Sequence, residues 1–232
     1  MTVSRGLMPP WLVRHDLLSP DECRDLLDWA LDNEAHFKPA ALDKGLVDPA
    51  IRRSLSLRDL GPFSRLFEGH VRAMVPELID QLRVTSFVAG EIELELVAHN
   101  DGAHFALHGD LYTGQGSARG DRLLSAVYYF HRAPKAFSGG CLRLHRIGAV
   151  PGDMGVDIAP DQNSLVAFPS WAPHEVLTVR CPSGAFGDSR FAVNCWVYRA
   201  NLRQPSADGD QPPVAHIGDE LDHVAATDRR ID

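Results

Sequence analysis

Short hydrophobic runs separated by turn residues dominate the chain after residue 90. From Glu91 to Leu96, glutamates alternate with isoleucine and leucine, which predicts a half-buried β-strand because successive side chains on a strand point to opposite faces. Further runs occupy residues 105–112, 123–130, 141–146, 155–158, 164–168, 174–179 and 190–198. Strands at this spacing, after a helical region, predict a double-sheet roll backed by helices.

Two helices are expected before this region. The sequence Ser-Pro-Asp-Glu at positions 19–22 combines an N-cap serine, a proline suited to the first helical position and a glutamate that completes a capping box. Apolar residues at helical spacing extend this helix to about residue 35. We expect a second helix over residues 63–82, kinked or broken at Pro76, and a strand over residues 52–60.

The expected fold class is α+β and mainly β, with a double-stranded β-helix (jelly-roll, cupin-like) core and N-terminal supporting helices. Residues 91–200 form the expected core, and residues 1–90 form a support region of the same domain. Residues 201–232 read as a polar, acidic tail that is weakly ordered. The chain has 232 residues, a length that suits one domain with an extension.

Composition excludes several classes of function. A formal net charge of −8 without a basic stripe argues against nucleic-acid binding. No apolar run is long enough to cross a bilayer, and the first ten residues lack the layout of a signal peptide. Four scattered cysteines without a CxxC pair predict reduced thiols in a cytoplasmic protein. The sequence does not determine the oligomeric state.

Two histidines and one aspartate are the candidate metal ligands. In His108-Gly-Asp110 the two side chains share one face of a strand, and His174 on a later strand is the candidate third ligand. Two histidines and one carboxylate leave three coordination positions open, as in non-haem Fe(II) oxygenases. A His-x-acid pair alone is weak, since about one or two arise by chance in such a composition. A second pair, His99-Asn-Asp101, is present, so surface or hydrogen-bonded core residues remain an alternative.

Further short motifs accompany this pair between residues 93 and 198. They are, in order, His99 with Gly102 and His108-Gly-Asp110; Val127-Tyr-Tyr-Phe130; Ser138-Gly-Gly-Cys-Leu-Arg-Leu144; Asn163 to Phe168 followed by Pro173-His-Glu-Val176; and Ser189 to Trp196. Their order and spacing resemble the prolyl-4-hydroxylase-like branch of the 2-oxoglutarate- and Fe(II)-dependent dioxygenases. The resemblance covers a little under half of the chain.

The resemblance implies an enzyme that hydroxylates an unactivated C–H bond with O2 and releases succinate and CO2 from 2-oxoglutarate. Its Fe(II) ligands would be His108, Asp110 and His174, and ascorbate is a candidate reductant. The substrate would be a prolyl residue of a protein or peptide, a free amino acid or another small molecule. Residues 112–121, as a lid, and residues 132–137 are candidate substrate contacts, although ordinary surface loops explain them equally well.

The same resemblance assigns residues to the cosubstrate. Arg190 would bind the far carboxylate of 2-oxoglutarate, for which a guanidinium offers a planar fork. Trp196 is six residues further on, so it shares a strand face with Arg190. Only one of Tyr128 and Tyr129 can face inward, and the register of the family favours Tyr129 as the second donor. His99 stands where the family usually has a tyrosine, so a cosubstrate contact and a structural role both remain open.

Two other classes of function remain as alternatives. One is a β-roll that binds a metal or ligand without turnover, and the other is a cupin-type metalloenzyme that does not use 2-oxoglutarate. The loop between His174 and Arg190 is longer than usual for the family and is expected to form a hairpin tip near residues 181–187. Arg143 and His145 point either toward the site or away from it.

Overall fold

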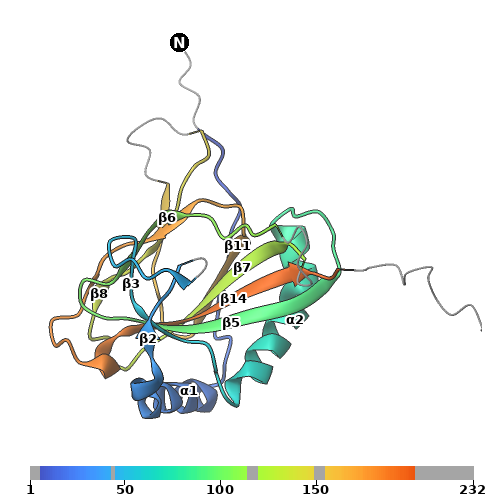
Figure 1. Cartoon of the computed structure of the whole chain (residues 1–232). Helices are drawn as coiled ribbons and strands as arrows, with labels where there is room; N and C mark the ends of the chain where they lie inside the picture. Colours follow the sequence, from blue (N-terminus) through green and yellow to red (C-terminus); the bar gives the residue numbers. More distant parts are fainter. Residues whose placement is uncertain (1–5, 43–44, 114–119, 149–154, 202–232) are drawn as a thin grey trace, which may run out of the picture. The chain divides into compact units, whose positions relative to one another are not determined.

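Two antiparallel β-sheets form the core of the computed structural model, which describes residues 6–42, 45–113, 120–148 and 155–201 (Figure 1). The larger sheet has the order β1 (Leu12–His15), β11 (Ser164–Pro169), β7 (Arg122–Phe130), β14 (Arg190–Arg199), β5 (Ala89–His99), β4 (Leu55–Leu57) and β2 (Lys38–Pro39). The smaller sheet has the order β10 (Val156–Ile158), β9 (Leu142–Leu144), β12 (His174–Val176), β6 (His104–His108) and β3 (Arg52–Arg53). β8 (Ser138–Gly139) and β13 (Val179–Arg180) form a separate pair. The double-stranded β-helix fold class is confirmed.

The first helix, α1 (Pro20–Asp32), begins with the expected capping box. The Ser19 hydroxyl accepts a hydrogen bond from the Glu22 backbone N–H, and the Glu22 carboxylate accepts one from the Ser19 backbone N–H. The helix ends three residues before the expected position, because a 3₁₀ turn over Glu34–His36 follows it. The expected end at about residue 35 was therefore wrong by one turn.

The second helix, α2 (Phe63–Gln81), runs through Pro76 without a break. Pro76 lies on the exposed side of the helix, where solvent can satisfy the carbonyl group that a missing N–H leaves unbonded. Phe67, Val71, Val75 and Leu78 form the buried face of this helix. The apolar stripe therefore outweighs the local cost of the proline.

The larger sheet is covered on both faces. Figure 1 shows α1 and α2 against one face, where Leu96 and Tyr128 join the main apolar cluster. The other face turns toward the smaller sheet and carries Val127 and Tyr129. Glu95 belongs to this inner face and is only 1% exposed. The expectation of a half-buried strand therefore holds at Glu91, which is exposed, but fails from Glu95 onward, where both faces of β5 are enclosed.

The segment 52–60, expected as one strand, is divided between the two sheets. Arg52 pairs with Phe105 of β6, whereas Leu55 pairs with Ala98 of β5. Ser54 lies between the two pairings, where the chain crosses from one sheet to the other. Alternation in a sequence predicts an extended backbone, but it does not predict to which sheet each part belongs.

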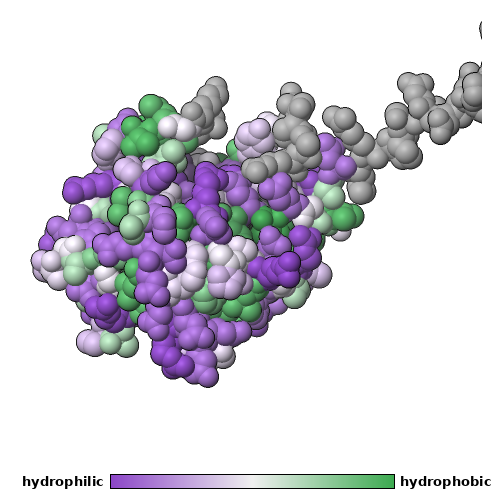
Figure 2. Space-filling view, turned by 60° about the horizontal axis from the view of Figure 1, so that its bottom comes forward, coloured by the Kyte–Doolittle hydropathy of each residue, from purple (hydrophilic) through white to green (hydrophobic). Residues whose placement is uncertain are grey.

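Hydrophilic side chains predominate on the face shown in Figure 2, and hydrophobic residues form small separate groups there. Within the part of the chain that the structure describes, no helix is long and apolar enough to span a bilayer. All four cysteines are free thiols.

Candidate metal centre and anion pocket

His108, Asp110 and His174 come together at the ends of two neighbouring strands. β6 ends at His108, β12 begins at His174, and the two histidines are register partners. One possible ligand atom from each residue lies within 4.8 Å of those of the other two. The Asp110 carboxylate oxygens lie 3.7 Å from His108 Nε2 and 3.6 Å from His174 Nε2. The three atoms thus converge on one point, which suits a single metal ion.

Backbone carbonyl groups orient both imidazole rings. His108 Nδ1 lies 2.8 Å from the Ala106 carbonyl oxygen, and His174 Nδ1 lies 2.9 Å from that of Ala172. A carbonyl oxygen only accepts, so each Nδ1 carries the proton and each Nε2 keeps a lone pair for a metal. Burial, followed by the nearby His174, lowers the pKa of His108 to about 4. His108 is therefore neutral at pH 7, as a metal ligand must be.

A serine holds the carboxylate of this cluster. Ser125 on β7 donates a 2.8 Å hydrogen bond to Asp110 Oδ2, and its hydroxyl lies 2.9 Å from that of Ser170. Burial raises the pKa of Asp110, but His174, His108 and the Ser125 hydrogen bond outweigh burial and lower it. Asp110 is therefore ionised, and the cluster presents one carboxylate and two imidazole donors. Such a set suits Fe(II) with open positions for other ligands.

A narrow cavity of about 40 Å³ connects the cluster to Arg190. Arg190 and Trp196 both line it, as their spacing on β14 predicts. Trp196 lies opposite Ser125 at the metal end, and its ring packs 4.4 Å from the Arg122 guanidinium carbon. Arg190 lies opposite His99 at the other end. The wall of the cavity consists of Arg52, His99, Phe105, His108, Asp110, Val127, Leu142, His174, Val176, Arg190, Asn194 and Trp196.

Arg190 is a buried cation, with only 1% of its surface exposed. Its Nε donates to the Gly140 carbonyl oxygen at 2.8 Å, and Nη1 donates to His99 Nδ1 at 3.2 Å. Gly140 has a φ of +68°, and a Cβ there would lie 2.7 Å from Arg190 Cδ. The glycine pair that precedes β9 therefore makes room for the arginine side chain. Burial lowers the pKa of Arg190, but a guanidinium remains charged at neutral pH.

Two donors at this end have no partner among the described residues: Arg190 Nη2 and the Tyr129 hydroxyl. The Arg190 guanidinium lies over the Tyr129 ring, 4.7 Å from its centroid. Burial raises the pKa of Tyr129 to about 12, so its hydroxyl is protonated. No acidic side chain in the described part of the chain forms an ion pair with Arg190. A buried, uncompensated cation beside a spare O–H donor fits an anionic ligand such as a carboxylate.

His99 completes this pocket with a defined tautomer. A guanidinium has no acceptor, so His99 Nδ1 accepts the bond from Arg190 and the proton resides on Nε2. Burial, reinforced by the positive charge of Arg190, lowers the pKa of His99 well below its usual value. His99 is therefore a neutral ring that holds Arg190 in place and retains one N–H donor.

Several candidates from the sequence lie elsewhere. Tyr128 points to the helical side, where its hydroxyl donates to Asn163 at 2.9 Å. Arg143 and His145 point away from the cavity and interact with Asp157 and Glu175, respectively. The segment 181–187 is not the expected hairpin tip, because β13 pairs with β8 and not with β14, and a 3₁₀ turn over Phe186–Asp188 follows. It lines a separate groove through Gly184 and Phe186. Residues 114–119 of the expected lid and residues 202–232 of the tail lie outside the described residues.

Sequence reasoning missed four polar residues of this region. Ser125 holds Asp110, as described above. Arg52 and Glu95 form a buried ion pair of 2.7 Å, and Asn194 donates to the same Glu95 oxygen at 3.3 Å. Asn194 lies two residues before Trp196 on the same strand, so the two side chains share a face. This spacing would have predicted that Asn194 points inward. Arg52 had no such signal, because its partner is 43 positions away in sequence.

Comparison with known proteins shows which family this chain is similar to. Residues 94–198 match the model of the 2OG-Fe(II) oxygenase superfamily. An uncharacterized PKHD-type hydroxylase from Synechocystis sp. is 36% identical over 190 residues, which cover 78% of this chain. The chain spans 61% of the length of that relative.

Solved structures support the fold. A Pseudomonas putida prolyl-4-hydroxylase superposes with a TM-score of 0.60 at 22% identity, covering 84% of this chain and 94% of its own. A Trichoplax adhaerens prolyl hydroxylase, solved with a hypoxia inducible factor peptide, gives a TM-score of 0.62 at 16% identity, covering 82% and 84%. Both similarities concern the fold alone.

Proposed function

From the match to the 2OG-Fe(II) oxygenase superfamily and the similarity to a PKHD-type hydroxylase, we propose that the chain is a prolyl 4-hydroxylase-like, 2-oxoglutarate-dependent non-haem iron dioxygenase that hydroxylates an unactivated C–H bond. In this proposal His108, Asp110 and His174 hold Fe(II), and Arg190 and Tyr129 bind the far carboxylate of 2-oxoglutarate. Trp196 and His99 shape the cavity between these two sites. The co-products are succinate and CO2.

One observation carries the proposal. The cavity that contains the three convergent ligand atoms also contains a buried guanidinium nitrogen, Arg190 Nη2, next to the Tyr129 hydroxyl, and neither atom has a hydrogen-bond partner among the residues that the structure describes. A β-roll that binds only a metal would not need the buried Arg190, since an unpaired buried charge is destabilising. A ligand with a metal-chelating end and a distant carboxylate satisfies both ends of the cavity.

The iron supplies dioxygen activation when it is bound, and the protein supplies binding and orientation. The two carbonyl-anchored imidazoles of His108 and His174 and the serine-held carboxylate of Asp110 would hold the iron. Arg190 and Tyr129 fix the distance and direction of the cosubstrate through charge-assisted hydrogen bonds. The narrow cavity leaves little room for water beside the reacting groups.

The proposed substrate is a prolyl residue of a protein or peptide, a free amino acid or another small molecule, with no role for nucleic acid. O2 is the oxidant, and ascorbate is a candidate reductant. The catalytic core comprises residues 91–200, supported by residues 1–90 and followed by the tail 201–232. A cytoplasmic location is part of the proposal, since four free thiols fit a reducing compartment.

Succinate formation tests the proposal. Purified protein with Fe(II), ascorbate and air should convert 2-oxoglutarate to succinate slowly even without a substrate, and chelation of the iron should stop the reaction. Arg190→Ala should abolish this conversion without removing the iron. Metal binding without any succinate would favour the non-catalytic β-roll, and turnover of another substrate that is indifferent to 2-oxoglutarate would favour a cupin-type enzyme.

A further inference from the structure

Two inward-facing acids of β5 have no part in the chemistry proposed above. Glu93 and Glu95 alternate with apolar residues along the strand, so both belong to the face that turns toward the smaller sheet. Glu95 is 1% exposed, and the side chain of Glu93 is 11% exposed. Enclosing a carboxylate is costly unless a cation compensates its charge. Each acid therefore needs a cationic partner.

Glu95 holds Arg52 beside one candidate iron ligand. Arg52 Nη2 lies 2.7 Å from Glu95 Oε2, and Asn194 Nδ2 donates to the same oxygen at 3.3 Å. The Arg52 guanidinium carbon lies 5.0 Å from the centroid of the Phe105 ring. That ring stacks on His108, with centroids 3.6 Å apart and an interplanar angle of 19°. The guanidinium and the two rings thus form a continuous series of contacts that ends at His108.

Glu93 holds a second guanidinium, that of Arg122. Arg122 Nη2 lies 2.9 Å from Glu93 Oε2, and the Tyr198 hydroxyl donates to the same oxygen at 2.7 Å. The guanidinium carbon lies 4.4 Å from the centroid of the Trp196 ring, which lines the cavity of the metal cluster. Arg122 Nη1 donates to the Asp110 backbone carbonyl oxygen at 3.5 Å. Arg122 therefore contacts a candidate ligand residue and the aromatic wall of the cavity.

Both ligand residues lie where a strand ends. β6 ends at His108, and Asp110 follows it outside the strand. A residue in such a position lacks the regular backbone ladder, so side-chain contacts contribute more to its orientation. β5, by contrast, lies inside the larger sheet, between β14 and β4. Its acids are thus fixed points that hold each guanidinium against the end of β6.

We propose that Glu93 and Glu95 are positioning residues of the metal centre, and that each acts through its guanidinium partner on one ligand residue. A guanidinium suits this role, because its edge pairs with a carboxylate while its flat face packs on an aromatic ring. The acids also neutralise two positive charges that would repel a metal ion at the cluster. This inference rests on the proposed function and adds to it the residues that prepare the site for iron.

Metal affinity and the visible absorption bands of bound Co(II), which report the geometry of its ligands, test the proposal without turnover. Glu93→Gln and Glu95→Gln keep the side-chain shape and remove the charge. Each should weaken Fe(II) binding roughly tenfold and change the Co(II) bands, as loss of an outer partner of a ligand does. Glu91→Gln is the matched control, because Glu91 lies on the same face of β5 and is exposed. It should leave Fe(II) affinity within about twofold, since an exposed charge contributes little.

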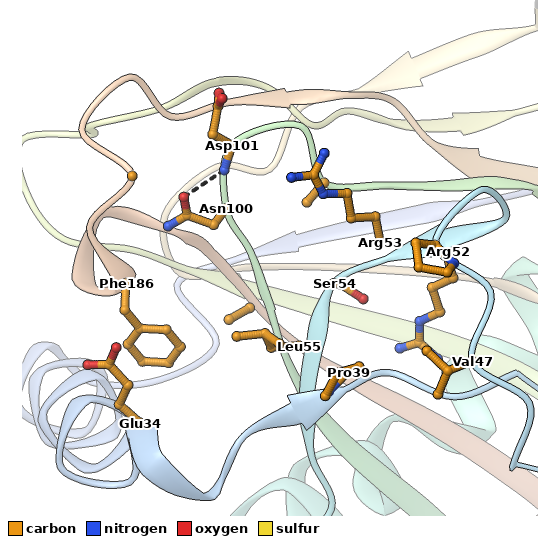
Figure 3. Close-up of a pocket in the computed structure, with 14 residues that line it drawn as sticks. Glu34, Pro39, Val47, Arg52, Arg53, Ser54, Leu55, Asn100, Asp101 and Phe186 are labelled. Carbon is orange, nitrogen blue, oxygen red and sulfur yellow. Dashed lines mark hydrogen bonds between the residues drawn. The ribbon is translucent and has the colours of Figure 1, made fainter.

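A double variant separates positioning from charge. Arg52→Met combined with Glu95→Met removes both charges, so no unpaired cation is left near the metal. Fe(II) binding should still be about fivefold weaker or more, because the Phe105 ring loses the guanidinium that packs on it. Wild-type affinity in the double variant would overturn the positioning role of Glu95. Arg53→Met is the control, since Arg53 is exposed and Figure 3 shows its side chain and that of Arg52 pointing in different directions.

Circular dichroism shows which variants fold. If a glutamine variant does not, Arg122→Lys tests the same contacts, because lysine can pair with Glu93 but has no flat face to pack on Trp196. Arg122→Lys should also weaken Fe(II) binding and change the Co(II) bands.

The charge-transfer band of the wild-type protein with Fe(II) and 2-oxoglutarate is recorded in parallel, so that failure of the proposed function is seen separately. Unchanged Fe(II) affinity and Co(II) bands in the folded variants, or an equal change in Glu91→Gln, would overturn the positioning roles and leave the proposed function standing. Absence of metal binding by the wild-type protein would overturn the function and the positioning roles together.

Discussion

The cavity that joins His108, Asp110 and His174 to Arg190, called the iron cavity below, has two different ends. They differ in how many of their polar groups have hydrogen-bond partners within the protein. At the metal end, both Nδ1 atoms and Asp110 Oδ2 have protein partners, and the remaining lone pairs converge. At the other end, Arg190 Nη2 and the Tyr129 hydroxyl have none among the described residues. One end is therefore prearranged to accept a cation, and the other carries a charge that only a bound anion compensates.

This difference has consequences for stability as well as for binding. At the metal end the polar groups are hydrogen-bonded, so removing one of them disrupts the arrangement of the others. At the Arg190 end, removing the unpaired buried charge removes a destabilising contribution. The two ends should thus respond in opposite ways to substitution in the absence of ligands.

The largest expected effect is at the metal end. His108→Ala removes one of three protein ligands, so iron affinity should fall by more than the roughly 10- to 100-fold that follows loss of an outer partner. Succinate formation should become undetectable. Iron content after dialysis, measured by atomic absorption, provides the check, with the exposed His15→Ala as control. Retention of stoichiometric iron by His108→Ala would show that the ligand set is wrong.

Arg190→Met should weaken the binding of 2-oxoglutarate by about 2–5 kcal/mol, because one partner of a buried charge pair is truncated. The same change should raise the unfolding free energy of the ligand-free protein, since it replaces an unpaired buried charge with an apolar side chain. Thermal unfolding with and without 2-oxoglutarate measures both effects. A destabilised ligand-free variant would contradict the view that this end is unsatisfied.

The pH dependence of stability should reflect the metal end. The pKa of His108 is lowered from 6.5 to about 4, so the unfolded chain binds its proton first as pH falls. The stability of the metal-free protein should therefore decrease by about 3 kcal/mol between pH 6.5 and pH 4 from this residue alone. Urea unfolding at several pH values tests this, and His108→Gln should flatten the curve in that window. An unchanged slope would remove His108 as the titrating group.

Ser125→Ala should have the smallest effect, lowering iron affinity by roughly 10- to 100-fold while the fold persists. The hydroxyl holds Asp110 without touching the metal, so Ser125→Thr should restore most of the affinity. Ser164→Ala is the matched control, because this buried serine on the adjacent strand β11 donates to the Asp161 backbone carbonyl in the turn before that strand and not to Asp110. If both alanine variants weakened iron binding equally, Ser125 would have no specific role in positioning Asp110.

The sequence predicted which residues lie together in one cavity better than it predicted the strands around that cavity. The spacing of His108, Asp110, Arg190 and Trp196 determines which side chains share a face, because each pair lies on or beside one strand. The placement of His174 opposite His108 needed the family motifs as well. Short-range geometry and motif order together therefore sufficed to gather these residues in one cavity.

Features that depend on distant partners were not predictable. The glutamates of β5 looked like a solvated face, but Glu95 is enclosed because Arg52 and Asn194 neutralise and bond it. Ser54 marks a crossover between sheets that alternation cannot reveal. In both cases the decisive interaction joins segments separated by dozens of residues or by a change of sheet.

The most direct test of the central claim is an anaerobic titration of the Fe(II)-loaded protein with 2-oxoglutarate, followed by the visible charge-transfer band of the chelate. The band should appear in the wild-type protein and in the exposed-residue control Arg180→Ala. It should be lost in His108→Ala, and Arg190→Met should require much higher 2-oxoglutarate concentrations. Absence of the band in wild-type protein with iron demonstrably bound would contradict the account.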